Sequence, residues 1–201
     1  MSSPDTPYRT VDDRGVTEFE IRGSRFIGHA APARTVGAAE QFIDEIASEY
    51  ADASHNVPAY RIRADPLREW ASDDGEPTGS AGKPALNVLQ QQDLENIVVV
   101  VTRYFGGTEL GVGGLARAYS RGVKDAIEAA GVSERKPHER AIITVEYDDS
   151  GTVRGILESE GIEFEASYET EVTFEAVVPM TKASDLYDRL QSATSGRARI
   201  D

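Results

Sequence analysis

The chain has 201 residues, of which 39% are apolar and 28% charged, a balance typical of globular proteins and not of disordered ones. It contains no cysteine, which excludes disulfide bonds, thiolate metal sites and a cysteine nucleophile. Its formal net charge of −14 excludes a broadly basic surface, so any contact with nucleic acid must be local.

The polar N-terminal segment and the lack of an apolar run long enough to cross a membrane predict a cytoplasmic protein. Only 4 of the 21 basic residues are lysines, and acidic residues are dense throughout. Such acidity suits a cytoplasm at high salt, because salt screens the repulsion between like charges. We therefore expect a halophilic source, with an acidic protein-binding surface as the alternative.

Hydrophobic periodicity predicts a first domain that mixes strands and helices. Its run 97–102 is rich in β-branched residues, which is typical of a strand buried on both faces. Gly131 is expected to end its last helix. In chain order, the predicted elements are strands at 17–21 and 24–29, a helix at 36–50, strands at 57–62 and 97–102, and a helix at 114–130.

A polar segment, Ser133–Arg140, is predicted to link this domain to a second one. The pattern beyond it has the β-α-β-β-α-β order of ferredoxin-like domains. Residues 139–201 carry 6 basic and 14 acidic side chains, a net charge of −8, so we expect the open face of this second sheet to repel phosphate. The predicted elements are a strand at 141–147, a helix at 152–160, a hairpin of 162–168 and 171–178 with Glu163, Glu165, Glu171 and Glu175 toward solvent, a helix at 183–192 and a strand at 198–200.

A polar loop, residues 72–84, interrupts the first domain. Three glycines and two prolines exclude regular structure there, and acidic, hydroxyl and ammonium groups crowd between them. One interpretation is a fixed loop that binds a ligand, and this ligand could include Mg²⁺ held by the carboxylates. The other interpretation is a solvated surface turn. His55 precedes a strand and belongs either to this site or to the hydrogen-bonded interior. The candidate residues are Asp73, Asp74, Glu76, Lys83 and His55.

A second loop leads from the strand at 97–102 into the helix at 114–130 and contains five glycines. Free N–H groups and the helix dipole favour an anion at such a helix N-terminus. Eight residues separate Thr102 from Gly111, which excludes a dinucleotide-binding turn, and no P-loop sequence is present. The alternative is that the glycines let the helix pack closely on the sheet. The candidate phosphate- or RNA-binding residues are Arg103, Gly111, Gly113, Gly114, Arg117 and Arg121.

At these two loops the sequence resembles the YigZ/IMPACT family of small translation-linked proteins. One departure is Val57, which stands where the family often has a cysteine, so a thiol is not expected to be required there. The matching segments span about half the chain and are Ser24–Ile27, His55-Asn56 with Tyr60, Ser72–Pro77, Ala81–Pro84, Val100–Gly107 and Leu110–Tyr119.

The resemblance implies an α+β fold of two domains. Residues 1–135 would form an IMPACT-type domain, a two-layer α/β unit like the second domain of small-subunit ribosomal protein five. Residues 139–201 would form a ferredoxin-like βαββαβ domain that resembles a domain of elongation factor G, which agrees with the order of elements deduced from periodicity.

From the loops and the resemblance together we expect a translation-associated regulatory or ribosome- and RNA-binding factor, with no catalytic residue, cofactor or metal assigned. Its expected partner is the ribosome, ribosomal or transfer RNA, or a ribosome-bound translation factor, and neither a membrane nor DNA. Two alternatives remain open: an enzyme that binds a small-molecule or nucleotide phosphate in the same groove, and a protein-interaction module that uses the acidic sheet face of residues 163–175.

Overall fold

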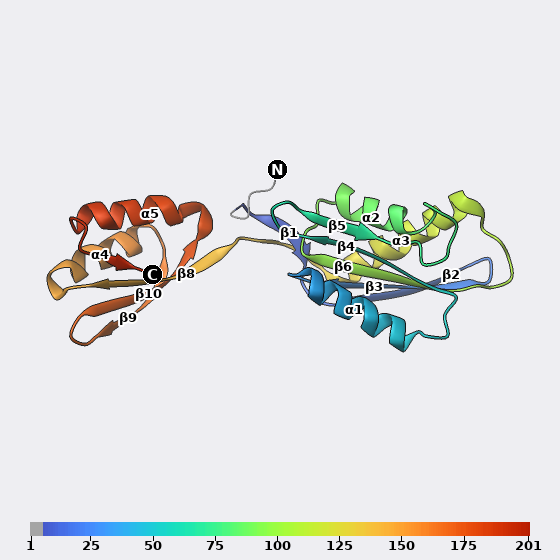
Figure 1. The fold of residues 1–201 in the computed structure, drawn as a ribbon, viewed down its shortest axis with the longest axis horizontal. Helices are drawn as coiled ribbons and strands as arrows, with labels where there is room; N and C mark the ends of the chain where they lie inside the picture. Colours follow the sequence, from blue (N-terminus) through green and yellow to red (C-terminus); the bar gives the residue numbers. More distant parts are fainter. Residues whose placement is uncertain (1–5) are drawn as a thin grey trace. The chain divides into compact units, whose positions relative to one another are not determined.

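The computed structural model describes residues 6–201, which form two compact units, one of Tyr8–Arg135 and one that contains Lys136–Asp201 (Figure 1). Within the described part of the chain, no helix is both long and apolar enough to span a membrane. The mixed fold class and the ferredoxin-like second unit confirm the prediction from sequence.

The first unit is built on a five-stranded antiparallel sheet of order β2-β3-β6-β4-β5. Its central strand β6 contains the run of β-branched residues, and Ile97 to Val101 are fully buried because helices cover both faces of the sheet. Strand β1 pairs with β7 in a separate two-stranded sheet. The strands of this unit are β1 Tyr8–Val11, β2 Gly15–Ile21, β3 Ser24–Pro32, β4 His55–Ile62, β5 Arg68–Ala71, β6 Ile97–Tyr104 and β7 Val132–Arg135.

Three helices cover this sheet. Helix α1, Val36–Glu49, packs on the face that carries Val98 and Val100, and Thr35 caps its N-terminus. Helices α2, Gly82–Gln91, and α3, Gly111–Ala130, pack on the other face, with Val99 and Val101 (Figure 1). The layer formed by α1 adds to the two layers expected from sequence, so the sheet is enclosed between helices.

Glycines set the distance between α3 and the sheet. A Cβ atom at Gly28 of β3 would lie 2.3 Å from the backbone oxygen of Gly122 in α3, and one at Gly15 of β2 would lie 2.3 Å from that of Ala126. Side chains at these positions would push the helix outward. Close packing of the helix on the sheet therefore depends on Gly15, Gly28 and Gly122.

The second unit has a four-stranded sheet of order β11-β8-β10-β9. Its apolar core, which includes Ile143, Phe174 and Leu190, lies between one face of the sheet and the two helices, and the other face is open. The elements are β8 His138–Val145, α4 Tyr147–Ser159, β9 Glu163–Tyr168, β10 Val172–Pro179, α5 Met180–Ala193 and β11 Arg199–Ile200.

Several predicted boundaries are wrong. The expected linker, Ser133–Arg140, instead consists largely of the end of β7 and the start of β8, with only Lys136 and Pro137 between the strands. The predicted loop 72–84 ends early, because α2 begins at Gly82 and tolerates Pro84 in its first turn, where a missing N–H costs little. Helix α3 begins at Gly111 and not at residue 114.

Candidate functional site

The loop between β5 and α2 turns the carboxylate of Glu76 inward. Glu76 is only 8% exposed, and its Oε1 atom accepts hydrogen bonds from Arg103 Nη1 at 2.6 Å and from the Tyr119 hydroxyl at 2.7 Å. Burial and the hydrogen bond to Glu76 raise the pKa of Tyr119 far above its ordinary value, so this phenol acts as a neutral donor. The loop is thus anchored to both β6 and α3 through one buried carboxylate.

Arg103 is buried and therefore does not lie at the surface, where it could contact a phosphate. It continues the alternation of Val99 and Val101 toward the face covered by α2 and α3, and it is 4% exposed. Its guanidinium is paired with Glu76 and lies 5.5 Å from the centre of the Phe26 ring and 5.3 Å from that of Phe105. The structure therefore corrects the expectation from sequence and removes Arg103 from the phosphate-binding set.

Asp73 fixes the other end of the loop. Its carboxylate accepts hydrogen bonds from three backbone N–H groups, those of Gly79, Ala81 and Gly82, at 2.8 to 3.0 Å. Two of these donors lie at the N-terminus of α2, where a negative charge is favoured. Partial burial acts to raise the pKa of Asp73, but the three donors outweigh it and hold that pKa below its usual value.

This depressed pKa gives a measurable pH dependence. The folded protein binds the Asp73 proton less tightly than the unfolded chain, so the stabilisation is present above the unfolded pKa of about 3.9 and is lost as pH falls through the folded value. We expect Asp73→Asn to be less stable than wild type at neutral pH by about 1 kcal/mol. Urea denaturation at a series of pH values should show this difference shrinking below about pH 4; a constant difference would contradict the assigned cause.

His55 and Asp74 join the loop to the start of β4. His55 Nδ1 lies 2.7 Å from the Asp74 carbonyl oxygen, and Nε2 lies 3.8 Å from Glu76 Oε1. The backbone N–H of Asn56 donates to the Asp74 carboxylate. This geometry matches the hydrogen-bonded structural role for His55, and all three loop carboxylates serve as internal acceptors.

The glycines at the N-terminus of α3 differ from those that pack the helix on the sheet. Gly111 and Gly113 are exposed, Gly114 is partly exposed, and a Cβ atom at any of them would meet no neighbouring strand. Leu110 occupies the N-cap position and makes no side-chain capping bond. The first N–H groups of an α-helix have no partner within the helix. This end of α3 thus presents backbone donors and the positive end of the helix dipole to solvent.

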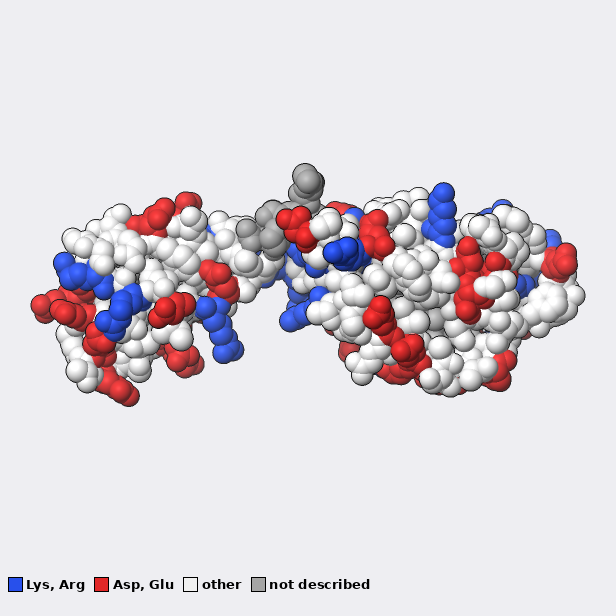
Figure 2. Space-filling model, in the orientation of Figure 1, with Lys and Arg blue, Asp and Glu red and all other residues white. Residues whose placement is uncertain are grey.

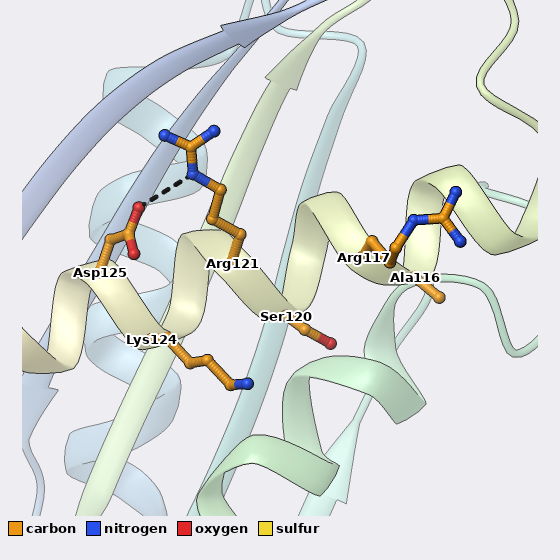
Figure 3. Close-up of a pocket in the computed structure, with 6 residues that line it drawn as sticks. All are labelled: Ala116, Arg117, Ser120, Arg121, Lys124 and Asp125. Carbon is orange, nitrogen blue, oxygen red and sulfur yellow. Dashed lines mark hydrogen bonds and ion pairs between the residues drawn. The ribbon is translucent and has the colours of Figure 1, made fainter.

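Basic side chains continue along α3 from this turn. Arg117, Arg121 and Lys124 follow one another at helical spacing and border an open hollow of about 360 Å³ (Figure 3). Arg121 is held by Asp125 at 3.2 Å and by the Phe19 ring at 4.2 Å. Arg117 and Lys124 have no ion-pair partner within residues 6–201. We call Arg117, Arg121 and Lys124 the basic face of α3.

The sequence-based candidates therefore separate into two groups. The structure brings Asp73, Asp74, Glu76, His55 and Arg103 together in one network around the buried Glu76–Arg103 pair, while Gly111, Gly113, Gly114, Arg117 and Arg121 lie along α3. Lys83 is exposed in the first turn of α2, which meets α3 where Ser120 Oγ lies 3.5 Å from the Pro84 carbonyl oxygen. Lys124 is not among the candidates from sequence, although its spacing of three residues from Arg121 indicates the same side of the helix. Acidic and basic side chains are both visible on each unit (Figure 2).

Both units match known domain families. Residues 22–127 match the Impact N-terminal domain, and residues 143–197 match a domain of unknown function, DUF1949. The IMPACT family member YvyE of Bacillus subtilis is 37% identical over 96% of this chain and 89% of its own. YigZ of Escherichia coli, also an IMPACT family member, is 32% identical over 90% of both chains.

Solved structures add the following likenesses. A structure described as that of a hypothetical protein is 29% identical and covers 97% of this chain and 96% of its own, with a TM-score of 0.69. The two-domain translational regulator Yih1 is 28% identical over 61% of this chain and 47% of its own, with a TM-score of 0.39. On the match to the Impact N-terminal domain and the identity with YvyE along nearly the whole chain, this protein belongs to the IMPACT family.

Proposed function

We propose that this protein is a translation-associated regulatory factor that binds ribosomal or transfer RNA through the N-terminus and basic face of α3. Membership of the IMPACT family supports the link with translation, and Yih1 is described as a translational regulator. The observation that carries the RNA contact is the continuity of the uncapped, exposed turn at Gly111–Gly114 with Arg117, Arg121 and Lys124.

The two parts of this surface complement each other chemically. Backbone N–H groups at a helix N-terminus bind a phosphate oxygen at short range, and the adjacent cations neutralise phosphates farther along a strand. The glycines leave part of the backbone of the first turn accessible, because Gly111, Gly113 and Gly114 have no Cβ atom and only Val112 carries one. The surface binds a local run of phosphates despite the net charge of −14, since a few close contacts and not a long-range field would provide the affinity.

The alternative of a phosphate-ligand enzyme gains no support from the loop at residues 72–81. Asp73 accepts from three backbone donors, Glu76 from Arg103 and Tyr119, and Asp74 from the N–H of Asn56. Each of these carboxylates thus already accepts from the protein's own donors, although of the three only Glu76 is buried. The loop therefore acts as the support on which the first turn of α2 and the neighbouring α3 rest.

The proposal is tested by replacing the two unpaired cations. We expect Arg117→Ala with Lys124→Ala to weaken the binding of fluorescein-labelled transfer RNA by about tenfold. The slope of log affinity against log salt should become shallower by about 1.4 to 1.8, as expected for two lost phosphate contacts. Fluorescence anisotropy across a salt series measures both quantities, and density-gradient sedimentation with purified ribosomes gives a second readout.

The matched control is Arg34→Ala with Arg68→Ala. Both side chains are exposed on the same unit, lie outside α3 and have no ion-pair partner among residues 6–201. This control removes the same charge, so it separates a local site from net electrostatics. Equal weakening in the two double variants would contradict the assigned surface, and unchanged binding in the α3 variant would refute it.

A further inference from the structure

The open face of the second sheet has a regular arrangement of side chains. Asp201, Ile142, Glu175 and Glu165 lie side by side across the strands in one row, because Ile142 pairs with both Asp201 and Glu175, and Glu175 pairs with Glu165. The next row contains Arg140, Val177 and Glu163. We call these seven residues the open sheet face. They surround a hollow of about 690 Å³.

Among the seven residues of this face, four carboxylate side chains surround a single cation, Arg140. Glu165 and Glu175 stand directly opposite each other on adjacent strands, where like charges repel. Neither they nor Glu163 form an ion pair within the described residues. The repulsion between Glu165 and Glu175 is unrelieved in the free protein.

Five basic residues of the unit are held in ion pairs with other carboxylates. Arg154 pairs with Glu158, and Arg197 pairs with Asp149. The remaining ion pairs are Lys182 and Arg189 with Glu160, and Arg199 with Glu171. Arg140 lies on the open sheet face beside Glu163, Glu165, Glu175 and Asp201. Arg199 lies in the adjacent row of the same side of the sheet, where Glu171 holds it. Asp149, Glu158, Glu160 and Glu171 are thus neutralised locally, whereas Glu163, Glu165 and Glu175 are left to attract a cation from outside.

Two aliphatic side chains lie between these carboxylates. Ile142 is 46% exposed and Val177 is 42% exposed, and both belong to central strands of the sheet. Ile142 is flanked by Asp201 on one side and by Glu175 on the other. Covering these side chains would remove apolar surface from water, which favours binding without any charge.

We propose that the open sheet face binds a basic segment of a protein in which lysine or arginine side chains flank an aliphatic one. The basic groups would meet Glu163, Glu165 and Glu175, and the aliphatic group would lie on Ile142 and Val177. A nucleic acid is disfavoured because its phosphates would face these carboxylates. A second copy of this chain is disfavoured because it carries the same net charge of −14.

The test uses the full chain and a synthetic peptide of repeating Lys-Leu-Arg units. A peptide of Lys-Ser-Arg units, which has the same charge but no aliphatic side chain, is the comparison probe. We expect Glu165→Gln with Glu175→Gln to weaken the Lys-Leu-Arg peptide by about tenfold. Ile142→Thr should weaken the Lys-Leu-Arg peptide but not the Lys-Ser-Arg peptide. Anisotropy measures affinity, and amide chemical shifts locate the contact on β8, β9 and β10.

The control is Glu128→Gln with Glu134→Gln, two exposed acidic residues of the first unit without an ion-pair partner in residues 6–201. It should bind the peptide as wild type does. Glu165→Gln with Glu175→Gln removes a repulsion, so its thermal midpoint should equal or exceed that of wild type, and weaker binding cannot then be ascribed to unfolding. Equal affinity of wild type and this variant, or chemical shifts confined to other surfaces, would overturn the proposal. So would a peptide-dependent dimer in sedimentation.

Discussion

Glu76→Ala is expected to destabilise the first unit by about 3–5 kcal/mol, because it leaves the Arg103 guanidinium buried without its counter-ion. The side chain of Arg103 is 5% exposed, so water cannot replace the lost carboxylate without a local rearrangement. Tyr119 loses its acceptor in the same step. Urea denaturation followed by far-ultraviolet circular dichroism measures the free energy of unfolding.

Two further variants isolate the cause of this loss. Glu76→Gln keeps an oxygen that can accept from Arg103 and Tyr119, so its loss should be smaller than that of the alanine variant. The double variant Glu76→Leu with Arg103→Met removes both charges, and its loss should be about 2 kcal/mol less than the sum of its single variants. If Glu76→Ala lost less than about 1 kcal/mol, the guanidinium would have an alternative partner and the buried pair would not anchor the loop.

Much of the fold follows from periodicity. The run from Ile97 to Val101 indicates a strand buried on both faces, and the structure covers it with α1 on one side and α2 and α3 on the other. In the second unit, alternation correctly separates Phe174 and Ala176, which are buried, from Glu175, which is exposed. Hydrophobic periodicity predicts these elements correctly because it reports which side chains are buried, and burial depends largely on the polarity of each side chain.

Elements without such a pattern were missed. Strand β5, Arg68–Ala71, lies at the sheet edge with three exposed residues and shows no buried face to detect. Strand β7 pairs only with β1, so its polar residues suggested a linker. Helix α2 starts at Gly82 and contains Pro84, both of which suggest a loop when tertiary contacts are unknown. In these cases the partner strand or the Asp73 cap, and not local sequence, determines the structure.

The candidate site divides in a similar way. Sequence places Arg103 beside a glycine-rich loop, which suggests a cation for an anionic ligand. The orientation of its side chain depends on the register of β6, where Arg103 continues the inward series of Val99 and Val101. Its partner Glu76 comes from a segment 27 residues away. Long-range pairing of this kind leaves no local signal, whereas the helical spacing of Arg117 and Arg121 does.

Glycines show most clearly that local sequence does not reveal long-range contacts. In the sequence, Gly106 and Gly113 look equivalent, since both lie in the second glycine-rich motif. In the structure, a Cβ atom at Gly113 would meet only the end of the Arg117 side chain, at 3.4 Å. One at Gly106 would lie 2.0 Å from the backbone carbonyl group of Gly23 in the turn between β2 and β3. Gly106 is thus required for packing, and Gly113 leaves a backbone exposed.

Gly106→Ala is therefore expected to cost about 3 kcal/mol, at the upper end of the usual range for an added methylene, because backbone atoms cannot yield as a flexible side chain does. The substitution would also strain the bond from the Gly106 N–H to Ser24 Oγ, which holds the loop to the start of β3. Urea denaturation measures the loss, and the Phe105 and Gly107 amide chemical shifts report whether the loop has moved.

Gly37→Ala is the matched control, because Gly37 lies in the first turn of α1 and the added methyl group would lie within 4 Å of no atom outside its chain neighbours and the backbone of its own helix. There the same substitution should stabilise the protein by about 0.5–1 kcal/mol, since alanine loses less backbone entropy than glycine in a helix. The two variants should thus change stability in opposite directions. If Gly106→Ala proved as stable as wild type, the two backbones would be farther apart than the Cβ distance of 2.0 Å implies, and the loop that leads to α3 would not be held at this point.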